Sequence, residues 1–331
     1  MRGPRQVLSH VVATQHHLHE DFAGVVPEIA SRAHLERIVP VVREALSQAD
    51  VGFNDLDAVA VGHRPGLIGS LLVGVSAAKA LAWSLGKPLI GVDHVISHLI
   101  AAELDDAPLE CPALGLVVSG GHSSIYLVHR PLEIDRIGRT IDDALGEAFD
   151  KAAAILDLGY PGGPAIDKLA QRGDDRTHDF PVAHLAADSL DFSFSGLKTA
   201  LLYAVRGRPT TRGESAVFDR DASDLNDPEK ADLAASFQRA AVRAVTKKIT
   251  RALEQHPGVK CLVIGGGVSA NTRLRAEMAA LAKQHKLPLR LPQMQYCLDN
   301  AAMIAGLAAH RFAARQFDDL TLSASTSSAI T

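Results

Sequence analysis

The sequence is poor in cysteine and aromatic residues and has no long uninterrupted hydrophobic run. Its 331 residues include three cysteines, Cys111, Cys261 and Cys297, which are odd in number and form no CxxC pair. We therefore expect no disulfide framework and a cytoplasmic location. No stretch reaches the roughly 18 uninterrupted apolar residues of a membrane-spanning helix. Residues 1–5 are charged and broken by glycine and proline, so no secretory signal is predicted.

The chain also lacks an excess of positive charge. Its formal net charge is −4, with 47% hydrophobic and 22% charged residues, which are the proportions of an ordinary globular protein. A nucleic-acid-binding domain is usually basic, so the balance argues mildly against wholesale nucleic-acid binding. A local basic patch, or a partner that supplies one, stays open. The length suggests two domains rather than one.

Strand and helix patterns alternate along the first third of the chain. Apolar residues at helical spacing predict an amphipathic helix over residues 34–46, with one face formed by Leu35, Ile38, Val39, Val42 and Leu46. Strands are then predicted at 58–61 and 88–92, and helices at 69–85 and 94–104. This order is typical of a mainly parallel sheet covered by helices.

The rest of the chain predicts a second α/β unit, joined to the first near residues 105–113. Two apolar runs within residues 113–129 flank a tight turn and indicate a β-hairpin. The expected helices are 144–156, 166–172, 195–206, 228–255, 269–285 and 300–315, with strands at 262–264 and 288–291. A long exposed loop is predicted at 206–227, and disorder after residue 319.

Two histidines four residues apart, His94 and His98, lie at the start of a predicted helix that follows a strand. This spacing puts both imidazoles on one face of the helix, where they could bind one metal ion. The alternative is a chance pair at the surface. Val95 replaces the glutamate of a zinc-peptidase HExxH motif, so peptidase chemistry is disfavoured. Asp299, before the last helix, could add a carboxylate ligand or could simply cap that helix.

Glycine-rich turns are the other candidate binding elements. The run Gly265-Gly266-Gly267 lies between a strand and a helix, where backbone N–H groups can approach a phosphate or ribose. A dinucleotide site would also show an acid after the next strand, and none is present there. The turns at residues 119–122 and 160–164 either let a ligand approach the backbone or only connect secondary-structure elements.

Taken together, these segments resemble the tRNA adenosine threonylcarbamoyltransferase family, from about residue 15 to residue 311. Nine motifs occur in the family's order, at residues 24–32, 65–74, 94–98, 118–122, 146–151, 160–164, 192–198, 265–271 and 299–305. The resemblance implies an actin/Hsp70/sugar-kinase-like (ASKHA) α/β fold, with nucleotide in a cleft between two lobes. It implies a first lobe at 1–110 completed by helix 300–315, a second lobe at 111–299, and a tail at 316–331.

The resemblance also implies the site. Its metal ligands match His94, His98 and Asp299, with iron(II) as the expected ion and zinc as the alternative. No catalytic residue is assigned. The substrate contacts match Val117, Val118, Ser119, Gly120, Gly121, Asp150, Gly163 and Asn271.

The implied reaction moves a threonylcarbamoyl group from threonylcarbamoyl-AMP to N6 of the adenosine 3′ of the anticodon, in tRNAs that read ANN codons. The implied partners are a TsaB-like subunit, docked through helices of the first lobe, and a TsaE-like ATPase. A non-catalytic paralogue that binds nucleotide and a partner subunit is the alternative.

Three features depart from the family pattern. The family's N-terminal hairpin with its Gly-x-Glu-Thr-Ser-Cys-Asp motif is not found, and residues 1–14 match the family's second strand. Arg64 stands before Pro65-Gly66, and Asp93 precedes the first histidine ligand. The absent hairpin would carry an acidic group near the reacting atoms, so we expect weak catalysis from the chain as written.

Overall fold

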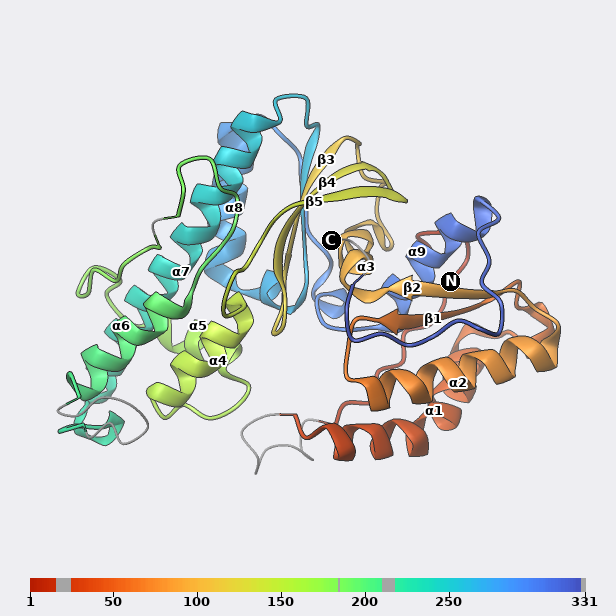
Figure 1. Cartoon of the computed structure of the whole chain (residues 1–331), viewed down its shortest axis with the longest axis horizontal. Helices are drawn as coiled ribbons and strands as arrows, with labels where there is room; N and C mark the ends of the chain where they lie inside the picture. The colour runs from red at the N-terminus through yellow and green to blue at the C-terminus, as the bar shows by residue number, and fades with distance from the viewer. Residues whose placement is uncertain (16–24, 184, 210–217, 329–331) are drawn as a thin grey trace.

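A computed structural model describes residues 1–15, 25–183, 185–209 and 218–328 of the protein. Two α/β lobes lie side by side (Figure 1). One lobe contains two parallel strands, β1 (Val59–Arg64) and β2 (Leu89–Asp93). Helices α1 (Pro27–Ala49) and α2 (Ile68–Leu85) form layers on one side of this sheet, and α9 (Ala301–Ala313) packs on the other.

The other lobe is built on a five-stranded sheet with the order β5-β4-β3-β6-β7. Strands β3 (Ala113–Val118) and β4 (Ser123–Arg130) form the predicted antiparallel hairpin. Strand β6 (Cys261–Gly265) pairs with β3 in parallel, and short β7 (Leu289–Arg290) follows it. The edge strand β5 (Glu133–Arg139) was not predicted, because its charged and partly exposed residues show little apolar pattern.

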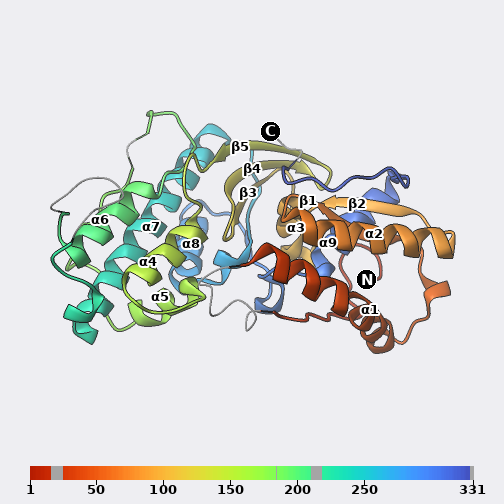
Figure 2. The same ribbon diagram turned by 60° about the horizontal axis from the view of Figure 1, so that its bottom comes forward.

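The remaining α-helices divide between the two faces of this larger sheet. The short helix α3 (His94–Ile100) lies between the two sheets. The others gather on the outer face, as Figure 2 shows. They are α4 (Leu145–Ile155), α5 (Gly162–Ala170), α6 (Ser195–Arg206), α7 (Asp227–Gln255) and α8 (Thr272–Gln284). The described residues also form 3₁₀ turns at Phe53–Asp55, Ala101–Glu103, Ala222–Asp224, Gly267–Ala270 and Met294–Tyr296.

Strand β3 is buried on both faces and therefore serves two cores. Leu114 and Leu116 pack toward the outer helices, in one cluster with Phe149 and Phe237. The alternate residues Ala113 and Val117 belong to a second cluster, which includes residues of α3 and α9. The site-bearing helix α3 is thus held against the central strand by apolar packing.

Several predicted boundaries were wrong by a few residues. Helix α5 begins at Gly162, four residues early, directly after the Pro161 turn. Helix α8 begins at Thr272 because Asn271 is its N-cap, and the residues before it form a 3₁₀ turn. Helix α3 ends at Ile100, and the predicted helix continues as a 3₁₀ turn.

The predicted buried face of α1 is only partly buried. Leu35 and Val39 are 67% and 55% exposed, whereas Ile38, Val42 and Leu46 are half-buried. Sequence periodicity finds an apolar stripe but cannot say whether this chain covers it. By length and composition alone α2 could cross a membrane. Here it packs on β1 and on α1 as a helix of the first lobe.

The strand expected within residues 1–14 does not form. Residues 1–7 instead turn at Gly3, which has a φ of 61°, and Arg2 bridges to Gln6. The segment then packs beside Asp105, whose side chain accepts a hydrogen bond from the Val7 N–H at 2.9 Å. The motif residue Gly24 and residues 210–217 of the predicted loop lie outside the described residues.

The disorder predicted after residue 319 was wrong for the described part of the tail, residues 319–328. His63 Nδ1 lies 2.9 Å from the Ser323 carbonyl oxygen, and the Ser325 N–H donates to the His63 carbonyl at 3.0 Å. Leu322 packs with the apolar residues between α2 and the β1–β2 sheet. A composition rich in serine and threonine concealed this anchoring.

The tail is anchored most strongly at Asp318. Its carboxylate accepts a hydrogen bond from the Gly91 N–H at 2.7 Å and pairs with Arg311 at 3.0 Å. We predict that Asp318→Ala lowers the free energy of unfolding by about 2 kcal/mol, since charged hydrogen bonds to β2 are lost. Chemical denaturation measures this loss, and Gln316→Ala, at an exposed neighbour, serves as the control. Equal stabilities of the two variants would refute the anchoring role.

Candidate metal centre and glycine-lined cleft

The end of β2 fixes the direction of the two histidines. Asp93 is the N-cap of α3, and its Oδ1 accepts hydrogen bonds from the N–H groups of Val95 and Ile96 at 3.0 and 3.4 Å. The helix therefore starts at His94, directly after the strand. His94 and His98 then share one face, with ring centroids 4.9 Å apart.

Asp299 approaches the same point from the connection that leads into α9. Its Oδ1 lies 3.1 Å from His94 Nε2 and 3.3 Å from His98 Nε2. The N-cap of α9 is the next residue, Asn300, whose Oδ1 accepts from the Met303 N–H at 2.9 Å. Asp299 is thus not needed as a helix cap, and its carboxylate is directed at the histidines.

These three side chains fit a metal ion. One ligand atom from each lies within 4.8 Å of the other two. The His98 side chain is 1% exposed, and apart from the contact of its Nε2 with Asp299 at 3.3 Å, its ring nitrogens make no hydrogen bond with the residues that the structure describes. Buried polar atoms normally have a partner, so this unsatisfied imidazole indicates a missing one. Two imidazoles and one carboxylate suit iron or zinc and leave positions open for a ligand.

The charges at this cluster favour metal binding as well. The Asp299 side chain is largely exposed, and its close contacts with His94 and His98, together with their charge, hold its pKa far below its usual range. Burial lowers the pKa of His98, which favours the neutral imidazole that a metal needs. The pKa of His94 would also fall through burial, but Asp299 and Asp93 together raise it.

The triple-glycine loop lies directly against α3, which carries the two histidines. A Cβ on Gly265 would lie 2.1 Å from the His98 carbonyl oxygen. A Cβ on Gly266, which has a φ of 89°, would lie 2.3 Å from the Val118 carbonyl oxygen. Only glycine permits both approaches. The loop, α3 and the end of β3 therefore meet at one place.

The predicted substrate turns are open where a ligand would approach. The turn after β3 is closed by the Ser119 N–H, which donates to the His122 carbonyl at 2.8 Å. Added Cβ atoms on Gly120, Gly121 or Gly163 would meet nothing within 4 Å. Backbone groups at these glycines are thus accessible.

The side chains of the two predicted valine contacts, Val117 and Val118, are fully buried in the apolar cores. These two residues can therefore contact a ligand only through their main chain.

Asp150 and Asn271 are both engaged in local structure, Asp150 in the turn before Gly163 and Asn271 at the start of α8. The Asp150 Oδ1 accepts from the Gly162 N–H at 2.9 Å, and burial raises the pKa of this carboxyl. The Asn271 Oδ1 accepts from the Leu274 N–H, and its Nδ2 donates to Gln238, both at 2.9 Å. Asn271 therefore has a structural role in capping α8, which its sequence context did not reveal.

His122 is a residue that the sequence analysis did not place in the site. Burial lowers its pKa, and it also senses the charges of His94, His98, Asp93 and Asp299. It therefore lies within electrostatic range of His94, His98 and Asp299. The sequence feature that could have indicated His122 is its position directly after the two glycines of the β3–β4 turn.

Comparison with known proteins agrees with this arrangement. The family model described as "TsaD: tRNA N6-adenosine threonylcarbamoyltransferase" matches residues 6–306. The chain belongs to this family. A relative of that name from Symbiobacterium thermophilum is 48% identical over 323 residues, which cover 97% of this chain and 90% of the relative. Another, from Anaeromyxobacter dehalogenans, is 50% identical over 307 residues, covering 92% and 87%.

Solved structures support the fold independently. HypF from T. kodakarensis superposes with a TM-score of 0.60 at 16% identity, over 86% of this chain and 45% of HypF. A full-length HypF in a phosphate- and nucleotide-bound form gives 0.59 at 14% identity, over 85% and 42%. At such low identity the likeness concerns the fold alone, and it confirms the two-lobed ASKHA architecture.

The metal assignment can be tested with a matched pair of histidine variants. We predict that His98→Ala lowers the bound metal at least tenfold after purification, because it removes a buried ligand. His129→Ala is the control, since His129 also pairs with an aspartate, Asp135, at 3.0 Å, but without a second histidine. Elemental analysis by mass spectrometry measures both. Equal metal content in the two variants would refute the site.

Proposed function

We propose that this chain transfers a threonylcarbamoyl group from threonylcarbamoyl-AMP to N6 of the adenosine 3′ of the anticodon, in tRNAs that read ANN codons. The observation that carries this proposal is the meeting of the family's motifs at one point. His94, His98 and Asp299 converge there, beside the triple-glycine loop. The presence of all three candidate metal ligands favours the enzyme over a non-catalytic paralogue, which would not need to retain them.

The reaction makes two demands on the site. The exocyclic amine of adenine is a weak nucleophile, so the carbonyl that it attacks must be polarised. A C–N bond forms, the amine loses a proton, and the C–O bond to the phosphate breaks as AMP leaves with the electron pair. A metal ion bound by His94, His98 and Asp299 would supply Lewis-acid polarisation.

The rest of the site would bind and orient the donor. The open backbone at Gly120, Gly121 and Gly163 offers N–H donors to phosphate or ribose oxygens. Asp150 holds the turn that carries Gly163, and Asn271 caps α8 after the triple-glycine loop. With Val117, Val118 and Ser119, they complete the proposed substrate site. We propose iron(II) as the ion, with zinc as the alternative.

The proposed lobe boundaries follow the packing. Helix α9 packs against α3, β2 and β1 although it lies at the far end of the chain. We therefore assign residues 1–110 and 300–315 to the first lobe, and 111–299 to the second. The tail is 316–331, and its described part contacts Leu89 and His63 of the first lobe.

We further propose a TsaB-like subunit and a TsaE-like ATPase as partners in the cytoplasm. Support for the first comes from α1 and α2, which expose Leu35, Val39, Leu72 and Trp83. An exposed apolar surface of this kind marks an interaction site. Support for the location comes from the three cysteines, which are all free.

Transfer activity is tested with the complete reconstituted system and tRNA. We predict that Asp299→Ala lowers kcat by roughly a hundredfold, since even outer partners of metal ligands contribute about 10–100-fold. Asp135→Ala, at the carboxylate that pairs with His129, should leave kcat unchanged. Mass spectrometry of the tRNA nucleosides quantifies the product. Full activity of Asp299→Ala would exclude its proposed role, and an inactive unsubstituted chain would favour the paralogue.

The subunit interface has its own test. We predict that Leu72→Asp prevents association with the TsaB-like subunit, because it buries a charge in an apolar contact. Leu72 is 52% exposed, so the substitution should leave folding intact. Leu132→Asp, at an exposed leucine between β4 and β5, is the control. Light scattering of the mixed subunits measures association, and an unchanged complex would remove α2 from the interface.

A further inference from the structure

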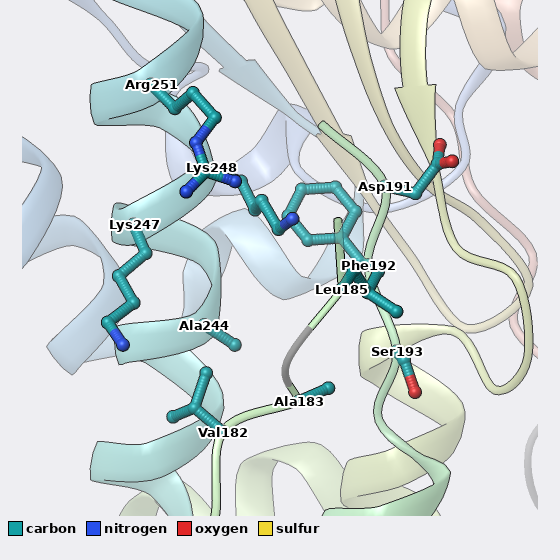
Figure 3. A pocket seen from close by; sticks show the side chains of 10 residues that line it. All are labelled: Val182, Ala183, Leu185, Asp191, Phe192, Ser193, Ala244, Lys247, Lys248 and Arg251. Carbon is teal, nitrogen blue, oxygen red and sulfur yellow. The ribbon is translucent and has the colours of Figure 1, made fainter. Parts of the chain in front are cut away.

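A small pocket on the second lobe contains none of the residues assigned to the metal site or the glycine-lined cleft. It has a volume of about 90 Å³ and lies between α7 and the segment that precedes α6 (Figure 3). Apolar side chains such as Phe192 and Ala244 line part of it. Its polar lining comes mainly from three cations of α7, namely Lys247, Lys248 and Arg251.

Two of these cations are held at fixed positions by one carbonyl group. Lys248 Nζ donates to the Ser189 carbonyl oxygen at 2.7 Å, and an Arg251 guanidinium nitrogen donates to the same oxygen at 3.0 Å. Partial burial lowers the pKa of Lys248, and the charge of Arg251 lowers it further. The two cations repel each other, so an anion between them would be favoured.

A single carboxylate, Asp191, lines the pocket beside the three cations. It offsets part of the repulsion at Lys248. Its Oδ1 is also engaged, because it accepts a hydrogen bond from the Arg139 N–H at 2.9 Å. The pocket therefore keeps a surplus of positive charge.

The positive charge continues along α7 beyond the pocket. Arg243, Lys247 and Arg251 follow one another at steps of four residues, so their side chains leave the same face of the helix. They span about 12 Å along the axis. Arg243 and Lys247 are exposed, and neither forms an ion pair within the described part of the chain. One step earlier, Arg239 pairs with Asp179 at 3.5 Å.

We propose that this pocket and the adjoining row of cations bind the sugar–phosphate backbone of the RNA substrate, with one backbone phosphate in the pocket. The idea rests on the proposed function, since it concerns how the same substrate is held. The pocket suits a compact oxyanion rather than a whole nucleotide. The row of cations beside it suits a polyanion rather than a lone ion. Lysine and arginine side chains of this kind form charge-assisted hydrogen bonds to phosphate.

The location predicts a specific kinetic effect. The pocket shares no residue with the metal ligands or the triple-glycine loop, so it should contribute to substrate binding and not to bond breaking. Loss of one phosphate contact should weaken binding equally for different tRNA sequences, and it should reduce the salt dependence of binding.

Lys247→Glu is the main test, because Lys247 is exposed and its replacement should not disturb folding. We expect the KM for tRNA to rise about tenfold, kcat to stay unchanged, and the slope of log affinity against log salt to fall by about one. Lys283→Glu, at an exposed lysine of α8, is the matched charge reversal. Arg251→Gln, checked by its thermal melting, tests the interior of the pocket in the same assays.

The outcomes separate the alternatives. Unchanged tRNA affinity and salt slope in Lys247→Glu would overturn the proposal. This holds also if the variant no longer binds an acidic protein subunit, because the cations would then serve that subunit instead of RNA. An equal effect of Lys283→Glu would also overturn it, since the effect would then reflect overall charge. If the unsubstituted chain binds tRNA but transfers nothing, the proposed function fails, while the binding assay still decides the pocket.

Discussion

The whole site depends on the close contact between the triple-glycine loop and α3. A side chain at Gly265 would collide with the His98 carbonyl, so the loop reaches the helix only because it has none. The parallel pairing of β3 with β6 brings the loop to that position, with Val117 opposite Gly265. Ligands of α/β folds bind at the carboxyl ends of such strands. The candidate metal ligands therefore lie next to the glycine backbone as a consequence of strand register.

Electrostatics then selects what this place can hold. His98 is buried, and its ring nitrogens lack good hydrogen bonds among the described residues. Asp299 beside it is ionised. This arrangement of polar groups is energetically unfavourable unless a cation binds there. Asp93 adds a second negative charge at the start of α3, where it caps the helix and raises the pKa of His94. The protein thus maintains a negative centre beside open glycine backbone. That combination suits a metal ion together with a phosphorylated donor.

Sequence reasoning found the local parts of this site and missed the contacts between distant ones. The spacing of His94 and His98 predicted two ligands on one helix face, because that depends only on helical geometry. Whether Asp299 capped a helix or met the histidines depended on the fold, and Asn300 proved to be the cap. The tail was misread for the same reason. Its anchoring through Asp318 uses a strand far away in sequence, which composition does not reveal.

Net charge was the weakest guide, because it averages over surfaces that act separately. A value of −4 argued mildly against wholesale nucleic-acid binding and left a local basic patch open, and α7 carries Arg243, Lys247 and Arg251 on one face. Two carboxylates beside α7 are engaged: Asp179 with Arg239, and Asp191 with a backbone N–H. Phosphate binding depends on the field within roughly one Debye length, about 8–10 Å, rather than on the total. An acidic chain can therefore hold RNA, provided that its cations are gathered and its nearest acids are occupied.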